Sequence, residues 1–498
     1  MCGYNCSCDH ESKDLFEKQK GFIDFSYAEL EEMNLETKRD RINGVEEFDF
    51  ETRFLKYLEC EKGVKALTIC FTDMEGKLQL LDYDKKYLIS SSDNLTFDGS
   101  SIRGFTAQKE SDLRLKVDWS SFRWMPADVF GSGKVLAFAH VYDRDGKPYE
   151  TDFRYKLAKL ARELRAEKGI VVNIAPEIEG FIFKGVHCEQ TYDERKGFEL
   201  ATMSGYFNCL PKDPLRLFID KVAEVQRALG FENEKDHPEV APAQFELNYK
   251  YTHALDASDQ IQLYKITARQ VAKLMGFTAN FLPKPVAGIN GSGMHTNISL
   301  ARNGKNLFYD ANGEEKLSKD AHKFLTAILN YAKDLCLVIN SSVNAYRRLD
   351  PHFEAPNEIK VSAFDRGSMI RIPVGNEKSA RIEVRTVAPD SNPYLYIYTL
   401  LKVGLYGMNV SDDEYEQMKE NVFGGGVKKL HGNIYTAMEF FSKSEFMKKV
   451  LGEDNHRKFL ELKKDVADRC PRELGVRVKA GEVLYHHEIT NQMLWGDF

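Results

Sequence analysis

The sequence predicts an α+β protein, and three observations support this class. A strand-rich segment occupies residues 47–150, amphipathic helical patterns recur through residues 151–498, and apolar strands with one polar face lie between those helices. The chain has 498 residues, of which 43% are hydrophobic, so it can bury large cores. We therefore expect an N-terminal extension over residues 1–46, a small β-rich domain over 47–150 and one large catalytic domain over 151–498.

Charge and composition exclude several classes of protein. Lys and Arg number 69 and Asp and Glu number 76, so the formal net charge is −7 and no nucleic-acid partner is expected. No window of about 18 apolar residues predicts a membrane span, and polar residues 1–20 lack the apolar core of a secretory signal. Nine cysteines without regular spacing do not indicate a disulfide framework, so a cytoplasmic location is expected.

The N-terminal extension contains two distinct features. Cys2, Cys6, Cys8 and His10 could bind a metal, but their spacing fits no common zinc module. Because chain ends are usually poorly ordered, we favour a reduced tail without a site. The charged stretch Ser26–Arg41 (SYAELEEMNLETKRDR) has the pattern of a helix, and the whole extension is interpreted as an appendage.

Three segments of the small domain predict strands. Val64–Thr72 (VKALTICFT) and Gln79–Tyr83 are rich in apolar and β-branched residues, and the segment Met74–Lys77 between them has turn composition. Lys134–Tyr142 (KVLAFAHVY) is a third strand, which a turn at Asp143–Gly146 ends. Short strands joined by tight turns are typical of a small β-rich domain.

Four segments of the large domain predict helices. Apolar residues recur at helical spacing from Phe153 to Leu164, and Gly169 is placed to end that helix. Similar helical patterns continue in Pro214–Leu229, Ala257–Met275 and Asp320–Ile339.

One strand of the large domain carries two carboxylates among apolar residues. In Val171–Phe183 (VVNIAPEIEGFIF), Glu177 and Glu179 project to one face and Ile178 to the other, because side chains alternate along a strand. Two adjacent carboxylates in an apolar strand are costly unless positive charge lies between them. The strand is therefore a candidate side of a cation site.

Two further strands repeat this pattern. In Ala243–Tyr251 (AQFELNYKY), Glu246 shares a face with other polar side chains, and Glu239 precedes the strand. In Ala380–Val387 (ARIEVRTV), Glu383 alternates with apolar residues in the same way. One such strand alone is typical of any half-solvated antiparallel sheet. Three together favour a polar cavity that binds Mg²⁺ or Mn²⁺, because these ions prefer carboxylate oxygens.

A glycine-rich segment, Pro283–Leu300 (PKPVAGINGSGMHTNISL), follows the acidic strands. Gly288, Gly291 and Gly293 allow the backbone to approach a ligand closely. His295 comes directly after them; a single histidine is more often structural, but its position makes a metal-ligand role an open alternative. The segment lacks the Gly-Lys-Ser/Thr spacing of a Walker A loop.

Basic residues are concentrated after position 345. Such a stretch is usually a solvated face, yet several members alternate with apolar residues, as in SMIRIP and ARIEVR. Guanidinium groups bind carboxylates and phosphates with two parallel hydrogen bonds. Beside acidic metal ligands they describe a site for a metal–nucleotide and an acidic substrate. The residues are Arg347, Arg348, Arg366, Arg371, Lys378, Arg381 and Arg385.

Taken together, the motifs from about residue 60 to 410 resemble the bacterial type I class of the glutamine synthetase family. They appear in the family's order along most of the chain, which makes the resemblance specific. The motifs are FDGSS at 97–101, ESD at 110–112, PEIEGF at 176–181, EVAPAQFE at 239–246, KPVAGINGSGMHTNISL at 284–300, RRLDPHFEAP at 347–356, DRGSMIRIP at 365–373 and RIEVRTVAPDSNPYL at 381–395.

The resemblance implies a fold and an assembly. The small domain would be β-grasp-like, and the large α/β domain would curve an antiparallel sheet into an active-site funnel. The family assembles stacked rings in which a neighbouring subunit supplies the FDGSS segment. We therefore expect a homo-oligomer, with a dodecamer of two hexameric rings as the expected form.

The resemblance also implies roles for individual residues. One metal ion would be held by Glu179, Glu239 and Glu246, and a second by Glu177, His295 and Glu383. L-Glutamate would contact Asn290, Gly291, Arg348 and Arg385. ATP would contact Glu234, Asn297, Ser299, Arg371 and Lys378, with Arg366 near the transferred phosphate. Ammonium would be bound by Asp98, Ser101 and Asp112, with Asp98 as the base, and Glu354 would close over the site.

The implied reaction is the ATP-dependent ligation of ammonia to L-glutamate. It would use two or more Mg²⁺ or Mn²⁺ ions and a γ-glutamyl phosphate intermediate, and it would yield L-glutamine, ADP and phosphate. Two alternatives remain open: a γ-glutamyl ligase for another amine or a polyamine, and a non-catalytic nitrogen-sensing member of the family. The compact anionic segment FDGSS favours ammonia, and the presence of every candidate metal ligand favours an enzyme.

Overall fold

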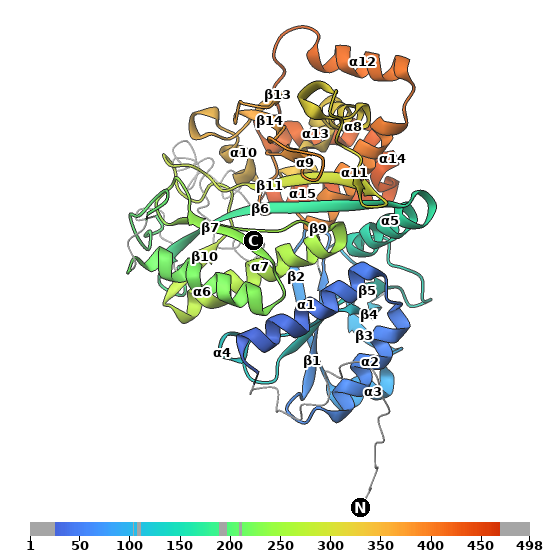
Figure 1. Cartoon of the computed structure of the whole chain (residues 1–498), viewed down its shortest axis with the longest axis vertical. Coiled ribbons are helices and arrows are strands. Elements are labelled where there is room, and N and C mark those ends of the chain that lie inside the picture. The colour runs from blue at the N-terminus through green and yellow to red at the C-terminus, as the bar shows by residue number, and fades with distance from the viewer. Residues whose placement is uncertain (1–24, 103, 107–110, 189–196, 209–211, 469–498) are drawn as a thin grey trace, which may run out of the picture.

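The computed structural model describes residues 25–102, 104–106, 111–188, 197–208 and 212–468 (Figure 1). The Cys2, Cys6, Cys8 and His10 cluster lies outside the described residues. In the described part of the chain, no helix is long and apolar enough to span a bilayer.

The first sheet has five strands in the order β2-β1-β5-β4-β3 and contains the blue elements at the bottom of Figure 1. β1 and β5 are parallel, while the other neighbours are antiparallel. Two helices of this part, α2 (Glu47–Cys60) and α3 (Lys85–Ser91), pack beside it. The strands are β1 (Ala66–Thr72), β2 (Leu78–Asp84), β3 (Leu95–Asp98), β4 (Asp112–Trp124) and β5 (Val135–Tyr142).

The second sheet has ten strands, and its main path is β13-β14-β15-β11-β6-β8-β7. Every pairing is antiparallel except β13 with β14, so the expected antiparallel sheet is confirmed with one exception at its edge. The strands are β6 (Ile170–Lys184), β7 (Asn233–Pro238), β8 (Gln244–Tyr249), β9 (Thr252–His253), β10 (Phe277–Asn280), β11 (Met294–Arg302), β12 (Lys305–Asn306), β13 (Glu358–Ser362), β14 (Ser368–Arg371) and β15 (Ile382–Val384).

Helices of the large domain cover the apolar face of this sheet. Along β6, residues alternate between buried and half-buried, and the buried set includes Ile174 and Ile178. Helices α5 and α7 pack against that strand, so Glu177 and Glu179 are left on the opposite face. The helices are α5 (Phe153–Lys168), α6 (Pro214–Ala228), α7 (Ala254–Leu274), α8 (Lys319–Asn330), α9 (Ala332–Ile339), α10 (Val343–Arg348), α11 (Pro393–Asn409), α12 (Asp412–Phe423), α13 (Ile434–Lys443), α14 (Glu445–Leu451) and α15 (Glu453–Asp468); α4 (Ala127–Phe130) belongs to the first domain.

Two secondary-structure expectations need correction. The predicted helix Asp320–Ile339 is divided into α8 and α9 at Tyr331, and its apolar periodicity continues across this single-residue kink. Residues 47–150 were expected to be strand-rich, yet they begin with helix α2. Its buried Phe50, Phe54, Tyr57 and Leu58 follow helical spacing, so the signal was present in the sequence.

Helix α1 (Tyr27–Asn43) is not an appendage. Ser26 and Glu29 form a capping box at its N-terminus, in which each side chain accepts a hydrogen bond from the backbone N–H of the other residue. Asn34 is fully buried and donates to the carbonyl oxygens of Trp124 and Ala228, at 3.0 and 2.7 Å. Those two carbonyls belong to the two different domains, so α1 lies between the domains and is bonded to both (Figure 1).

A buried charge cluster joins the same parts of the chain. Arg154 on α5 donates to Asp118 on β4 at 2.7 Å and to Asp259 on α7 at 2.8 Å. Arg41 of α1 adds ion pairs to Asp118 and Asp256, at 3.0 and 2.7 Å. The cluster therefore fixes the small domain, the extension helix and the catalytic domain relative to one another.

Candidate active site

The candidate site is a row of polar side chains that crosses the second sheet from strand to strand. His295 on β11 lies opposite Glu177 on β6, and Glu179 on β6 lies opposite Glu246 on β8. At the ends of the row, Arg371 lies opposite Glu383, and His237 lies opposite Glu246. Directly opposed residues have their Cβ atoms about 5 Å apart, so the register of the sheet places these groups side by side.

These side chains line one cavity of about 210 Å³. All six residues that the sequence predicted as metal ligands contribute to its wall. Seven more predicted site residues do so too: Asn290, Gly291, Arg348, Glu354, Arg366, Arg371 and Arg385.

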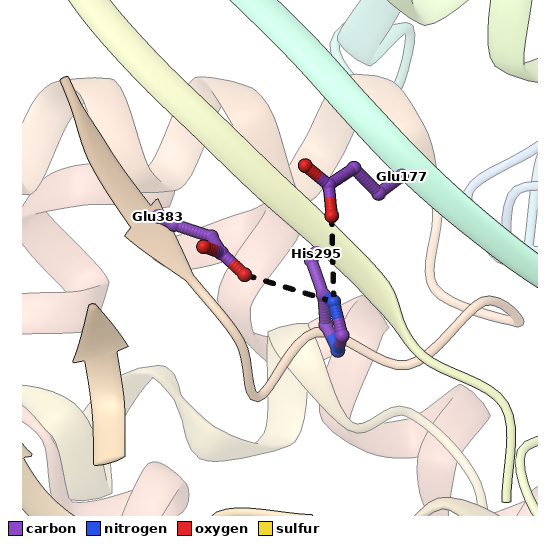
Figure 2. Close-up of side chains that lie close together, drawn as sticks. All are labelled: Glu177, His295 and Glu383. Atoms are coloured by element: carbon purple, nitrogen blue, oxygen red, sulfur yellow. Dashed lines mark ion pairs between the residues drawn. The ribbon is translucent and has the colours of Figure 1, made fainter. Parts of the chain in front are cut away.

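The first candidate metal group is Glu177, His295 and Glu383, drawn in Figure 2. Nδ1 of His295 lies 3.8 Å from a carboxylate oxygen of Glu177 and 3.7 Å from one of Glu383. These separations are too long for hydrogen bonds, but they suit ligand atoms arranged around one shared ion. This trio is the one that the sequence predicted to share a metal.

The second candidate group is His237, Glu239 and Glu246. Nδ1 of His237 lies 3.5 Å from Glu239, and its Nε2 lies 3.7 Å from Glu246. The sequence had predicted Glu179 as the partner of these two glutamates. Glu179 lines the same cavity and lies 3.9 Å from Nε2 of His295, between the two groups.

Burial and mutual repulsion together raise the pKa of two carboxylates on the acidic wall. Burial, and next the negative charge of Glu179, raise the pKa of Glu239 to about 7. Burial and the charges of Glu177 and Glu179 hold the pKa of Glu246 well above its usual range. Burial also opposes ionisation of Glu177, but the neighbouring His295 and Asn297 outweigh it and lower that pKa to about 2. A bound dication would relieve the repulsion among these carboxylates.

A basic wall faces the carboxylates. Arg371 and Arg385 both donate to Glu383, through Nε at 2.5 and 3.2 Å. Arg348 donates to backbone carbonyl oxygens, of which that of Arg385 lies at 2.9 Å. Nη1 of Arg385 is buried and has no hydrogen-bond partner in the described residues. Such an unpaired donor beside a cavity can donate a hydrogen bond to the carboxylate of a ligand.

The glycine-rich segment brings backbone into the site. The amide of Gly293 donates to Glu179 at 2.8 Å. A Cβ atom on Gly293 would lie 2.5 Å from Nη2 of Arg348 and 2.7 Å from Nε2 of His295, so any larger residue would displace these two side chains of the site. Glu354 accepts a hydrogen bond from Asn290 at 3.1 Å and has a positive φ of 60°, a strained conformation for this residue.

Seven predicted site residues lie outside the cavity wall. Asn297 supports the wall, since it donates to Glu177 at 2.9 Å and accepts from Arg381 at 2.9 Å. Ser299 lies farther along β11, and Glu234 and Lys378 are exposed. The remaining three, Asp98, Ser101 and Asp112, lie together in the small domain, where Asp98 and Asp112 are cross-strand neighbours. The predicted roles of all these residues stay predictions.

The sequence reasoning missed three polar residues of the wall. His237 and Lys235 lie on β7 at alternate positions before Glu239, a spacing that predicts a common face. Gln244, two residues before Glu246 on β8, donates to Glu179 at 3.2 Å and to the carbonyl oxygen of Gly291 at 3.0 Å. It therefore links the acidic strand to the glycine-rich segment.

Comparisons with known proteins identify the family of the chain. The family model described as "Glutamine synthetase, beta-Grasp domain" matches residues 63–144, and "Glutamine synthetase, catalytic domain" matches residues 150–474. A glutamine synthetase of Clostridium saccharobutylicum is 36% identical over 406 residues, which cover 79% of this chain and 89% of the relative. One of Staphylococcus aureus (strain MW2) is 36% identical over 419 residues, which cover 81% and 91%.

Two solved structures share the fold. A GmaS protein in complex with ADP superposes with a TM-score of 0.70 at 25% identity, covering 83% of this chain and 95% of that one. A glutamine synthetase of Plasmodium falciparum superposes with a TM-score of 0.73 at 21% identity, covering 88% and 98%. A β-grasp domain, a curved sheet and an acidic cavity with a basic wall define a ligase architecture. The chain belongs to the glutamine synthetase family.

Replacing Glu246 by Gln should weaken divalent-cation binding by about tenfold or more, because a neutral amide is a poorer ligand than a carboxylate of the same shape. Titration of the intact protein with Mn²⁺, followed by calorimetry, measures the effect. Glu163→Gln is the matched control, because Glu163 is exposed on α5, away from the cavity. An unchanged Mn²⁺ titration would remove Glu246 from the metal site.

Proposed function

We propose that the protein ligates ammonia to L-glutamate at the expense of ATP, forming L-glutamine, ADP and phosphate. The main observation that supports this proposal is one cavity in which two carboxylate–histidine groups face five arginines. Such a cavity can hold divalent cations on one wall and the anionic groups of a nucleotide and an amino acid on the other. The membership of the family, whose relatives are glutamine synthetases, supports the same reaction.

The donor set fits divalent cations. Glu177, His295 and Glu383 would hold one ion, and Glu239 and Glu246, with His237 or Glu179, a second. When bound, Mg²⁺ or Mn²⁺ supplies positive charge that stabilises the transferring phosphoryl group.

The basic residues would bind and orient the substrates. Arg348 and Arg385 are buried, and the free Nη1 of Arg385 is available to a substrate carboxylate. A γ-carboxylate oxygen of glutamate then attacks the γ-phosphorus of ATP, and ADP leaves. Arg366 has no ion pair in the described part of the chain, so its guanidinium is available to the transferred phosphate.

The second half-reaction requires an ammonium site. The nitrogen of ammonia attacks the acyl carbon of γ-glutamyl phosphate, and phosphate leaves; ammonium must first lose a proton, because it has no lone pair. Asp98 would accept that proton. Hydrogen bonds from Ser100, at 2.6 and 2.9 Å, and from Ser101, at 2.5 Å, lower the pKa of Asp98, so the carboxylate stays ionised and attracts a cation.

Asp98 does not line the cavity of its own chain. The proposed reaction therefore needs a second subunit whose Asp98 segment reaches the cavity, and we propose a homo-oligomer, expected as two stacked hexameric rings.

Glu354, strained and bonded to Asn290 at the cavity wall, would exclude water from the acyl phosphate. Cys60, Cys70 and Cys336 have free thiols, which supports a reducing cytoplasm as the location.

A second candidate is the ligation of an amine other than ammonia to glutamate. The observation that keeps it open is the similarity, at 25% identity across most of both chains, to a GmaS protein, whose name is not that of a glutamine synthetase. The cross-strand pair Asp98 and Asp112, with Ser101 beside it, is compact and anionic, which favours the small ammonium ion.

Phosphate release from ATP tests the proposal directly. The intact oligomer is incubated with Mg²⁺, ATP and L-glutamate, and ammonia, methylamine or a polyamine is added in turn. We expect glutamine-forming turnover with ammonia at a kcat/KM at least about tenfold above that for either amine. Faster turnover with an amine would replace ammonia as the substrate, and binding of ATP without turnover of any amine would indicate a non-catalytic member.

A further inference from the structure

Six cations line the active-site cavity, and two of them have neither an ion-pair partner nor a hydrogen-bond partner among the described residues. Arg371, Arg385, Arg348 and Arg381 all donate to side chains or carbonyl oxygens of the protein. Within the described part of the chain, neither Arg366 nor Lys235 forms an ion pair or a side-chain hydrogen bond. A cation at a cavity wall without a protein partner is available to an anionic ligand. The role of Arg366 follows from the family; that of Lys235 does not follow from any motif above.

The position of Lys235 is determined by a β-bulge in β7. Asn233 pairs with Tyr249, and Lys235 pairs with Asn248, so two residues of β7 span one residue of β8 and Glu234 is the extra residue. Bulges change the direction of side chains beside active sites. After this bulge, Lys235 and His237 lie at alternate positions and both line the cavity, opposite Asn248 and Glu246.

Lys235 therefore stands on the acidic wall, across the sheet from the arginines. Its neighbours in the row, His237 and Glu246, belong to the second candidate metal group. No carboxylate of the described residues lies within 4.0 Å of its Nζ. After the larger effects of burial, His295 and Asn297, the charge of Lys235 helps to lower the pKa of Glu177. Its ammonium is nevertheless exposed and forms no ion pair, so it can also contact an anion that enters the cavity.

We propose that Nζ of Lys235 binds a phosphate group of the nucleotide. This inference rests on the proposed function, because it assumes that ATP is the nucleotide substrate. The polyphosphate chain is the longest anion in the reaction, so it can offer phosphates to Lys235 on the β7 wall as well as to Arg366. The carboxylates of glutamate have other donors, namely Arg348 and the free Nη1 of Arg385. Lys235 would act as a point charge that helps hold the phosphates beside the metal ions.

Calorimetric titration of the intact oligomer with ADP and with adenosine, both in Mg²⁺, tests this assignment. Lys235→Ala should weaken ADP binding by about tenfold, because one charge-assisted contact is lost, and should leave adenosine binding unchanged. Lys235→Arg should retain ADP affinity within about threefold, because the charge is kept. Lys250→Ala is the matched control, since Lys250 lies just beyond β8, is paired with Glu232 at 3.0 Å and does not line the cavity.

The possible results separate this proposal from the proposed function. An unchanged ADP affinity in Lys235→Ala, or an equal loss of affinity for ADP and adenosine, would overturn the phosphate contact. Neither result would contradict the proposed ligase reaction. A rise in KM for glutamate without a change in ADP affinity would assign Lys235 to glutamate instead. Failure of the wild-type protein to bind ADP would overturn both proposals together.

Discussion

Replacing Asp98 by Ala should lower the rate of ammonia-dependent glutamine synthesis by about 10²–10⁴-fold, the usual contribution of a positioned base. The physical reason is twofold. The variant loses the ionised carboxylate that Ser100 and Ser101 stabilise, and it also loses the acceptor for the ammonium proton. Affinity for ADP should not change, because Asp98 lies in the small domain and does not line the cavity of its own chain.

A comparison of ammonia with hydroxylamine as the amine substrate tests whether Asp98 acts as the base. Hydroxylamine is mostly neutral near neutral pH and needs neither a cation pocket nor a base to become nucleophilic. Asp98→Ala should therefore retain far more activity with hydroxylamine than with ammonia. Asp93→Ala is the matched control, because Asp93 is exposed in the same domain, just before β3. Synthesis from ammonia near the wild-type rate would show that Asp98 is not the base.

Replacing Arg154 by Met should destabilise the protein by about 3–5 kcal/mol, the usual cost of leaving buried charges without their partner. Arg154 is 1% exposed and is the only residue that bonds both Asp118 and Asp259 at under 3 Å in the described part of the chain. Without it, Arg41 would be the only cation within 4.0 Å of either carboxylate in the described residues, and the remaining donors, Tyr394 to Asp259 and Ser120 to Asp118, are neutral. Thermal unfolding should show a Tm lower by about 5 °C or more, while the control Arg144→Met, at an exposed site, should leave Tm unchanged.

The pH dependence identifies the cause of this loss. Burial would raise the pKa of Asp118, but Arg41 and Arg154 outweigh it and hold that pKa well below 3.8. A group whose pKa is depressed on folding contributes its stability above its unfolded pKa and loses it as the pH falls through the folded value. The difference in Tm between wild type and Arg154→Met should therefore shrink below about pH 4. A constant difference across this range would mean that packing, not charge, causes the loss.

Local patterns identified much of this molecule. Alternation along β6 placed Glu177 and Glu179 on one face, and the structure has α5 and α7 on the other. Local helical patterns located α5, α6 and α7 to within a few residues. The kink at Tyr331 was missed because one residue with altered backbone angles does not interrupt the helical spacing of the apolar residues.

The residue types of the active site could be predicted from the sequence, but which side chains lie next to each other could not. Glu383 and His295 are 3.7 Å apart, although 88 positions separate them in the chain, and only the register of β11 with its neighbours decides this. Lys235 was missed because β7 (NEKDHP) lacks the apolar alternation that predicts a strand, so its alternating polar residues were not assigned to a common face. The bonds of Asn34 and Arg41 to both domains likewise required the packed structure.

The amino-acid sequence by itself determined which residue types alternate on which strand faces, and therefore that acidic and basic side chains would meet on a polar surface of an antiparallel sheet. This is possible because side-chain direction along a strand repeats every two residues and depends on local geometry alone. Only the tertiary structure decided which carboxylates share a neighbour, where Lys235 points and how α1 joins the domains. Those outcomes depend on strand register, a bulge and interdomain packing, all of which arise from contacts between residues far apart in the chain.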